Sequence, residues 1–307
     1  MGPTQFCPSD TFTISVQPPP GTSVRLSLPE TYSRQTNRPT DTESASNSKS
    51  TGDDGANPPI FNDAIQVRAG VFIDEQKCSP EGEIDDDDPR SWQWVIYASR
   101  TVSGSNTSTS SSTGPAPAAA AAAAVASSAR STIPVAVIRL VPPPQPPHEA
   151  LLAHSNDAPL LPRYDWTHEP CIKLTRVAVL PEYRGLGLGR RLVQTALDWA
   201  VTHAEEIDDA TRELASRFAF QGPSRDVRSG PSTGQAREEQ KPDWSPAPWR
   251  GLVLVHAQVD VEAMYRGMGF VRDDELGRWD EEGIEHVGMF RRVEIRSKNL
   301  QSPFGVN

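Results

Sequence analysis

Residues 177–192 read VAVLPEYRGLGLGRRL, and this stretch decides how the rest of the chain is interpreted. The apolar run from Cys171 to Val179 predicts a β-strand, and residues 181–189 predict a turn. From Arg190 to about Ala204, apolar residues recur at helical spacing and predict one buried helix face. That face comprises Leu192, Val193, Ala196, Leu197 and Ala200. The order is therefore strand, glycine-rich turn, helix.

A glycine-rich turn at the start of a helix is suited to binding an anion. The first main-chain N–H groups of a helix lack internal acceptors, and the helix dipole adds partial positive charge there. Gly185, Gly187 and Gly189 leave room for a phosphate to approach the backbone, and Arg184 and Arg190 add positive charge. A turn that only reverses the chain is the plain alternative. The Rossmann glycine spacing fits poorly, and no Gly-Lys-Ser/Thr follows as a P-loop requires.

Further strands and helices are predicted on both sides of this unit. Residues 61–72 predict a helix with an apolar stripe at Ile65, Ala69 and Phe72. Strands are predicted at 92–97, 133–141 and 252–255, then near 270–279 and 284–295, with a short helix around 261–266. Strands that alternate with helices indicate an α/β or α+β domain with a sheet flanked by helices.

Low-complexity segments interrupt the predicted domain. Residues 1–58 are rich in Ser, Thr, Pro and Asp and are predicted to be a disordered extension. The folded domain is predicted at 59–296, with flexible insertions at about 101–132 and 205–249, followed by a tail at 297–307. The recognisable domain is therefore divided into several pieces along the chain.

The glycine turn in its full context resembles a known family. V-A-V-x-P-x-Y-R-G-x-G-x-G before an apolar helix is similar to motif A of the GCN5-related N-acetyltransferase (GNAT) superfamily. The resemblance implies the GNAT acyl-CoA N-acyltransferase fold, a mixed sheet flanked by helices, with acetyl-CoA as co-substrate. It also implies that the pyrophosphate of acetyl-CoA is held by the segment that follows the strand. The cofactor-binding residues implied are Val177, Ala178, Val179, Arg184, Gly185, Leu186, Gly187, Leu188, Gly189 and Arg190.

A second block, from Leu252 to Phe270, resembles the later GNAT motif, in which a strand leads to a helix that carries a tyrosine. In that family the two strands part and the pantetheine arm lies between them. Tyr265 matches the tyrosine that protonates the leaving thiolate. A phenol with a pKa near 10 is protonated at neutral pH and can donate a proton. The alternative is that Tyr265 only packs the helix against the sheet.

Several separate blocks resemble the ElaA-type branch of the superfamily. They are Val71-Phe72 with Glu75-Gln76, the acidic run 83–88, Arg176, Ala257-Gln258, and residues 282–289. This chain departs from that branch at Trp92-Gln93-Trp94 and in its two insertions. The resemblance implies no particular acceptor substrate.

The remaining catalytic and substrate-binding candidates come from these blocks. We expect Glu75 to be the general base, directly or through water, and Gln258 and His286 to bind or orient substrate. Each of the three could instead be a surface or hydrogen-bonding residue. The run Asp85–Asp88 either attracts a cationic amine, with Asp85 in the substrate site, or is a solvated loop. It lacks the spacing and glycine of an EF-hand.

The composition of the chain argues against several classes of binding partner. The formal net charge of −10 argues against nucleic acid, since phosphate backbones call for clustered Lys and Arg. The three cysteines are far apart and support neither a disulfide framework nor a metal site. No signal peptide or membrane span is predicted, so we expect a cytoplasmic protein, with the nucleus as the alternative.

The sequence predicts an N-acetyltransferase that acts on a primary amine of unidentified nature, an enzyme with no metal. A protein or histone lysine acetyltransferase is one alternative. A non-catalytic acyl-CoA-binding module, or a scaffold that acts through its low-complexity segments, is another. The oligomeric state is left open.

Overall fold

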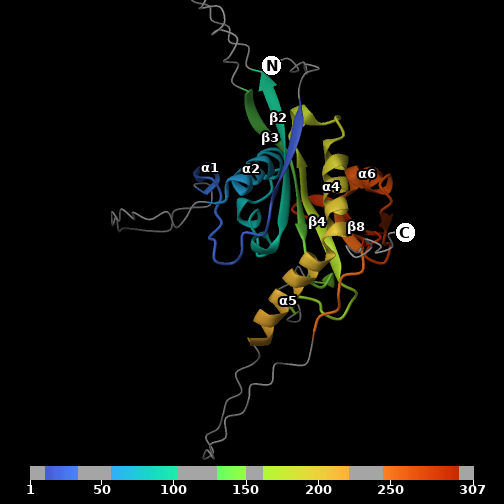
Figure 1. Ribbon diagram of the computed structural model, residues 1–307. Coiled ribbons are helices and arrows are strands. Elements are labelled where there is room, and N and C mark those ends of the chain that lie inside the picture. The colour runs from blue at the N-terminus through green and yellow to red at the C-terminus, as the bar shows by residue number, and fades with distance from the viewer. Residues whose placement is uncertain (1–10, 34–56, 102–129, 150–161, 221–244, 297–307) are drawn as a thin grey trace, which may run out of the picture.

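A mixed β-sheet runs through the part of the protein that the computed structural model describes, which comprises residues 11–33, 57–101, 130–149, 162–220 and 245–296. The strand order is β1-β2-β3-β4-β5-β8-β6, and β7 pairs with β8 beside this path (Figure 1). The strands are β1 Phe12–Gln17, β2 Trp92–Thr101, β3 Arg130–Val141, β4 Cys171–Val179, β5 Leu252–Gln258, β6 Val271–Arg272, β7 Arg278–Glu281 and β8 Ile284–Arg292.

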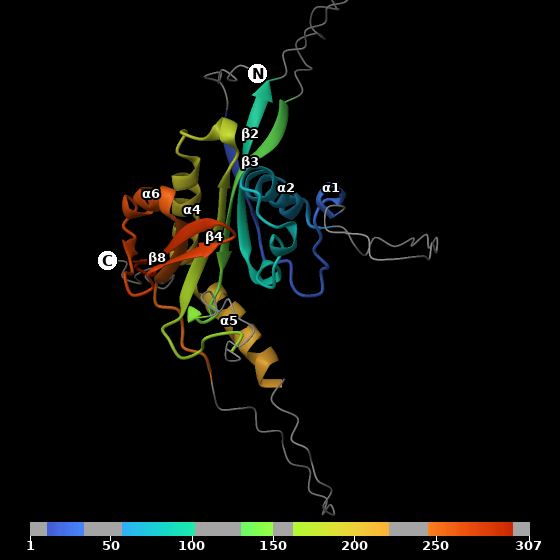
Figure 2. The ribbon, with the colours of Figure 1, turned by 180° about the vertical axis from the view of Figure 1, so that it is seen from behind.

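Helices cover both faces of the sheet, as the two opposite views show (Figures 1 and 2). Helix α2 (Pro59–Arg68) continues into the π-helical segment η1 (Ala69–Glu75) and packs on one face through Ala64, Val67 and Val71. Helix α4 (Leu188–Thr202) packs on the other face and buries the five residues that its periodicity predicted. The remaining helices are α1 Glu30–Ser33, α5 Ala204–Phe220 and α6 Glu262–Arg266, with short 3-10 turns at Pro80–Gly82, Asp88–Arg90, Pro181–Tyr183 and Val259–Val261. The predicted fold class is confirmed.

The two central strands pair over only part of their length. Strands β4 and β5 run parallel and are in register from Cys171 and Leu252 to Leu174 and Val255. Beyond that point β4 continues to Val179 and β5 to Gln258 without pairing to each other. The sheet therefore opens between their carboxyl ends.

A bulge in β4 accompanies this opening. Val137 and Arg139 on β3 are two residues apart, whereas their partners on β4, Ala178 and Thr175, are three apart. The additional residue bends β4 locally, and Arg176 has a positive φ of 52°. A bulge of this kind turns a strand away from its neighbour and redirects its side chains.

Two predicted boundaries are wrong. Residues 12–17, expected to belong to a disordered extension, form edge strand β1 and pair antiparallel with β2. Residues 204–220, expected to begin a flexible insertion, form α5, which buries Ile207 and Ala215. Both segments contact distant parts of the chain: β1 pairs with β2, and α5 is hydrogen-bonded to Pro143 and Trp249. Of the predicted insertion at about 101–132, residues 102–129 lie outside the described residues, whereas the flanking residues belong to β2 and β3. Residues 221–244 and the tail at 297–307 also lie outside the described residues.

Candidate active site

The glycine turn lies between β4 and the first residue of α4. Gly185 and Gly187 have φ values of 79° and 76°, in the left-handed region that favours glycine. A Cβ atom built on either residue would meet no atom within 4 Å, so the turn faces open space. Among the described residues, the first main-chain N–H of α4 with an acceptor is that of Arg191, which donates to the Gly187 carbonyl at 3.0 Å. The preceding N–H groups are available to an anion.

One cavity of about 740 Å³ brings together nearly all the predicted site residues. It runs from the glycine turn along the opening between β4 and β5. The predicted residues that line it are Glu75, Asp85, Val177, Ala178, Val179, Arg184, Gly185, Gly187, Leu188, Gly189, Arg190, Gln258, Tyr265 and His286. Leu186 is the exception, because its side chain is 44% exposed and lies outside the cavity lining.

Tyr265 lies on α6 where the helix closes against the opened strands. Its side chain is only 4% exposed, and its ring packs edge-on against Phe270 with centroids 5.5 Å apart. Burial raises the pKa of the Tyr265 hydroxyl above its ordinary value. The phenol is therefore protonated throughout the physiological pH range and faces the cavity as a proton donor.

Glu75 does not stand free in the cavity. Arg184 forms a bidentate ion pair with it, from Nη1 to Oε1 at 2.7 Å and from Nη2 to Oε2 at 2.5 Å. Arg184 also donates from Nε to the Val179 carbonyl at 3.0 Å. The hydrogen bonds from Arg184 lower the pKa of Glu75, and a carboxylate with both oxygens engaged is a weak base.

Gln258 and His286 lie opposite one another in the register of β5 and β8. Gln258 donates to Gln76 Oε1 at 3.1 Å, and Gln76 donates to Gln258 Oε1 at 3.4 Å, which connects β5 to the end of η1. His286 Nδ1 lies 2.8 Å from the Ile284 carbonyl, an acceptor, so Nδ1 carries the proton. The Nε2 atom of His286 is then left as an acceptor.

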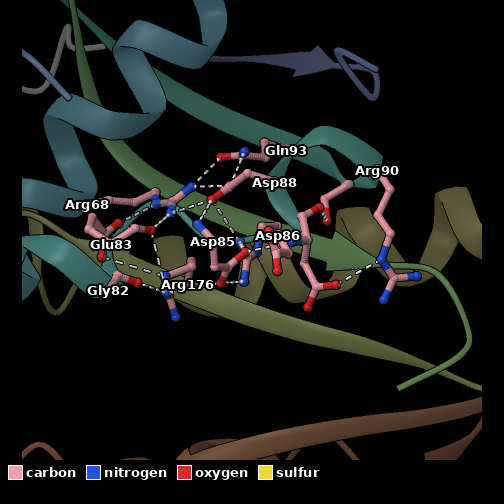
Figure 3. A network of polar contacts seen from close by, with 12 residues as sticks. Arg68, Gly82, Glu83, Asp85, Asp86, Asp88, Arg90, Gln93 and Arg176 are labelled. Carbon is pink, nitrogen blue, oxygen red and sulfur yellow. Dashed lines mark hydrogen bonds and ion pairs between the residues drawn. The ribbon is translucent and has the colours of Figure 1, made fainter. Parts of the chain in front are cut away.

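Three carboxylates of the acidic run, those of Asp85, Asp87 and Asp88, are paired with arginines, whereas the side chain of Asp86 is 81% exposed. Figure 3 shows carboxylates of the run meeting arginines from α2 and β4. Arg68 and Asp88, both with 0% exposure, form an ion pair at 2.7 Å, and Arg68 Nε reaches Glu83 at 2.5 Å. Burial alone would raise the pKa of Asp88, but Arg68 and Arg139 hold it well below its usual range. The network is structural, and it fixes the acidic segment against the sheet.

Asp85 belongs to the same network although it lines the cavity. Arg139 binds it in bidentate fashion at 2.7 and 2.8 Å, and Arg176 Nη2 lies 3.3 Å from Oδ2. Its carboxylate is therefore largely neutralised by protein groups. The sequence could not show this, because Arg139 and Arg176 come from separate strands.

Sequence reasoning missed a polar group at the far end of the cavity, formed by Lys173 on β4, His256 on β5 and Glu281 on β7. Glu281 Oε1 accepts from Trp279 Nε1 at 2.7 Å and lies 3.3 Å from His256 Nδ1. Burial lowers the pKa of His256 to about 4, and the neutral ring keeps its proton on Nδ1 beside the carboxylate. The available signal was a polar residue at alternate positions of otherwise apolar strands.

Two further properties concern the described residues alone. They contain no cluster of His, Cys, Asp and Glu with the arrangement of a metal site. The helices among them include none with the length and apolar character needed to span a bilayer.

Comparisons with known proteins agree with the site. The sequence model of the Acetyltransferase (GNAT) family matches residues 129–220, which contain β3, β4, the glycine turn and α4. A comparison with curated proteins gives no match. An acyl-CoA N-acyltransferase from Pseudomonas aeruginosa is 18% identical to this chain. The match covers 75% of this chain and 89% of that protein, with a TM-score of 0.35. Escherichia coli ElaA is also 18% identical to this chain. The match covers 76% of this chain and 89% of ElaA, with a TM-score of 0.35.

The family match covers the segment that builds the phosphate-binding turn and the bulged strand. The described sheet, with its opening between β4 and β5, has the mixed α/β architecture that the resemblance implied. Residues 129–220 of this chain are therefore similar in sequence to the Acetyltransferase (GNAT) family, and the described part of the chain has a mixed α/β fold.

Proposed function

We propose that this protein transfers the acetyl group of acetyl-CoA to a primary amine. The observation that carries the proposal is the single cavity that joins the glycine turn, the parted strands and the buried Tyr265 hydroxyl. An acyl-CoA needs a place for a pyrophosphate, a narrow channel for its arm and a proton donor for its thiolate. The cavity offers all three in that order.

The residues at the turn fit the phosphates of the cofactor. The free N–H groups at the start of α4 can donate to phosphate oxygens, and Arg184 and Arg190 can neutralise their charge. The walls next to the turn, Val177–Val179 and Met264, are apolar and suit an uncharged arm. A main-chain N–H near Val179 is proposed to polarise the thioester carbonyl, and acetyl-CoA supplies the activated acyl group.

Amine transfer also requires a proton acceptor and a proton donor. We assign the donor role to Tyr265, since burial keeps its phenol protonated. Glu75 can serve as the base only when Arg184 turns from it toward a phosphate, because in the ion pair its lone pairs are occupied. His286, with Nε2 left as an acceptor, is the alternative base in the same cavity.

Calorimetric titration with acetyl-CoA tests whether the glycine turn binds the pyrophosphate of the cofactor. The full-length protein should bind, and an Arg184→Glu, Gly187→Glu variant should lose at least tenfold in affinity, because it places two carboxylates against the pyrophosphate. Arg212→Glu is the matched control: it makes the same charge reversal on exposed α5, where Arg212 pairs with Asp209.

The control variant should bind like the parent protein. Failure of a demonstrably folded parent to bind acetyl-CoA would contradict the acetyltransferase proposal. Binding without turnover of any amine would favour the non-catalytic acyl-CoA-binding module. Turnover of a lysine-containing peptide in preference to small amines would favour the protein acetyltransferase.

A further inference from the structure

The end of the cavity away from the glycine turn lies on the sheet face opposite α4. On β4, Ile172 and Leu174 are buried in the core under α4, so Lys173 projects from the other face. On β5, Val255 and Ala257 are in that core, so His256 and Gln258 project with Lys173. Because α2 and η1 cover β2 and β3 rather than this part of the sheet, the polar side chains remain in contact with the cavity.

In the described part of the chain, Lys173 is a cation without a direct counter-ion. Its side chain is partly exposed and faces the cavity, and the reduced solvation there lowers the pKa of its ammonium group. Among the described residues, no carboxylate lies within ion-pair distance of that group and none accepts a hydrogen bond from it. The carboxylates that act on it from further away are engaged elsewhere: Asp87 binds Arg90 at 2.8 Å, and Glu281 binds Trp279 and His256.

A partly desolvated charge without a hydrogen-bonded partner is unfavourable, and an anionic ligand in the cavity would supply that partner. Lys173 lines the main cavity and also a second cavity of about 690 Å³, so an incoming group can reach it. Glu281 supplies a negative charge. Burial acts to raise its pKa, but hydrogen bonds from His256 and Trp279 lower it, so the carboxylate stays ionised. Neither of these two hydrogen-bond donors carries a charge. Lys173 and Glu281 together suit a molecule with charges of both signs.

We propose that Lys173 binds an anionic group of the acceptor, so that the substrate is an amine that also carries a carboxylate or a phosphate. This rests on the proposed acetyltransferase function, since it names the acceptor of that reaction. Val177 is four positions beyond Lys173 on β4, which corresponds to roughly 13 Å of strand. The lysine side chain spans part of that distance, so the anion and the reacting amine lie several bonds apart, as in an ω-amino acid.

The test compares three acceptors of equal chain length: 6-aminohexanoate, 6-aminohexyl phosphate and hexylamine. Binding to the full-length protein is measured by calorimetry, and turnover is measured with saturating acetyl-CoA. We expect at least one of the two anionic acceptors to bind at least tenfold more tightly than hexylamine. The anionic acceptor that binds more tightly shows whether the group that Lys173 binds is a carboxylate or a phosphate.

Lys173→Met keeps the length of the side chain and removes its charge. This variant should lose the preference for the anionic acceptors, through KM more than kcat, while its affinity for acetyl-CoA stays that of the parent. Lys77→Met, at an exposed lysine outside both cavities, is the matched control and should keep the preference.

Three results would overturn the inference: equal binding of hexylamine and both anionic acceptors, no binding of either anionic acceptor, or an equal loss for all three in Lys173→Met. Acetyl-CoA binding is measured separately in the same preparations. Its absence in the parent would contradict the proposed function itself, so the two failures are distinguishable.

Discussion

At the scale of single residues, the site depends on how burial and hydrogen bonding fix protonation states. The Tyr265 phenol is held neutral by burial, and the Glu75 carboxylate is held ionised by Arg184. His256 is held neutral beside an ionised Glu281. Among these groups, the Tyr265 phenol is therefore a fixed proton donor, and the carboxylates of Glu75 and Glu281 stay ionised near neutral pH.

Replacing the donor tests this arrangement. Tyr265→Phe keeps the ring that packs on Phe270 and removes the hydroxyl, so the free energy of unfolding should change little. General acid catalysis contributes roughly 10²-fold or more, and kcat should fall by about that factor with acetyl-CoA affinity retained. Steady-state kinetics over pH 6–9 would check it, and undiminished turnover would remove Tyr265 from the mechanism.

The sequence indicated the anion-binding turn but not the acceptor end. Gly185 and Gly187 stand next to each other in one motif, and the local conformation they require is a property of that motif. Lys173, His256 and Glu281 come from three strands and meet only through sheet pairing. The acidic run suggested a substrate role for Asp85, because its two arginine partners, Arg139 and Arg176, are distant in the sequence and leave no local signal.

At the scale of secondary-structure elements, a clear periodic spacing of apolar residues predicted an element correctly, whereas a short or weak pattern did not. The apolar face of α4 specified the helix and its packing. Edge strand β1 has only Phe12, Ile14 and Val16 in a polar context, and its hydrogen bonds depend on β2, far along the chain. A short edge strand of this kind is set by its partner more than by its own residues.

Truncation measures what β1 contributes. Removing residues 1–10 should leave the free energy of unfolding nearly unchanged, since β1 begins after them. Removing residues 1–17 should lower it by about 2 kcal/mol, because Phe12 and Ile14 pack against the core and would be lost. Urea unfolding followed by tryptophan fluorescence compares the two proteins. Equal stability would mean that β1 adds nothing to the sheet.

At the scale of the whole molecule, the buried arginine–carboxylate network joins α2, the acidic segment, β3 and β4 (Figure 3). Removal of one partner leaves an uncompensated buried charge. Asp88→Asn should therefore lower the free energy of unfolding by about 3 kcal/mol at pH 7.

The pH dependence of that loss has a definite sign. The pKa of Asp88 is lower in the folded protein than the value of about 3.9 in an unfolded chain. Its contribution is fully present above that unfolded value and is lost as pH falls through the folded pKa. Urea unfolding at pH 7, 5, 4 and 3 should show the difference between parent and Asp88→Asn shrinking only below about pH 4. A constant difference down to pH 3, or a difference that already shrinks between pH 7 and 5, would contradict the assignment.

The short parallel contact between β4 and β5 also has a mechanical consequence. Four register pairs, Cys171–Leu174 with Leu252–Val255, form the whole of the direct pairing between the two parts of the sheet. Helix α4 packs mainly on β2, β3 and β4, and α6 packs on β5. Under a load applied across the sheet, these strands would separate first. A molecule held between β4 and β5 would resist that separation, so the force needed to open the protein should report directly on occupancy of the site.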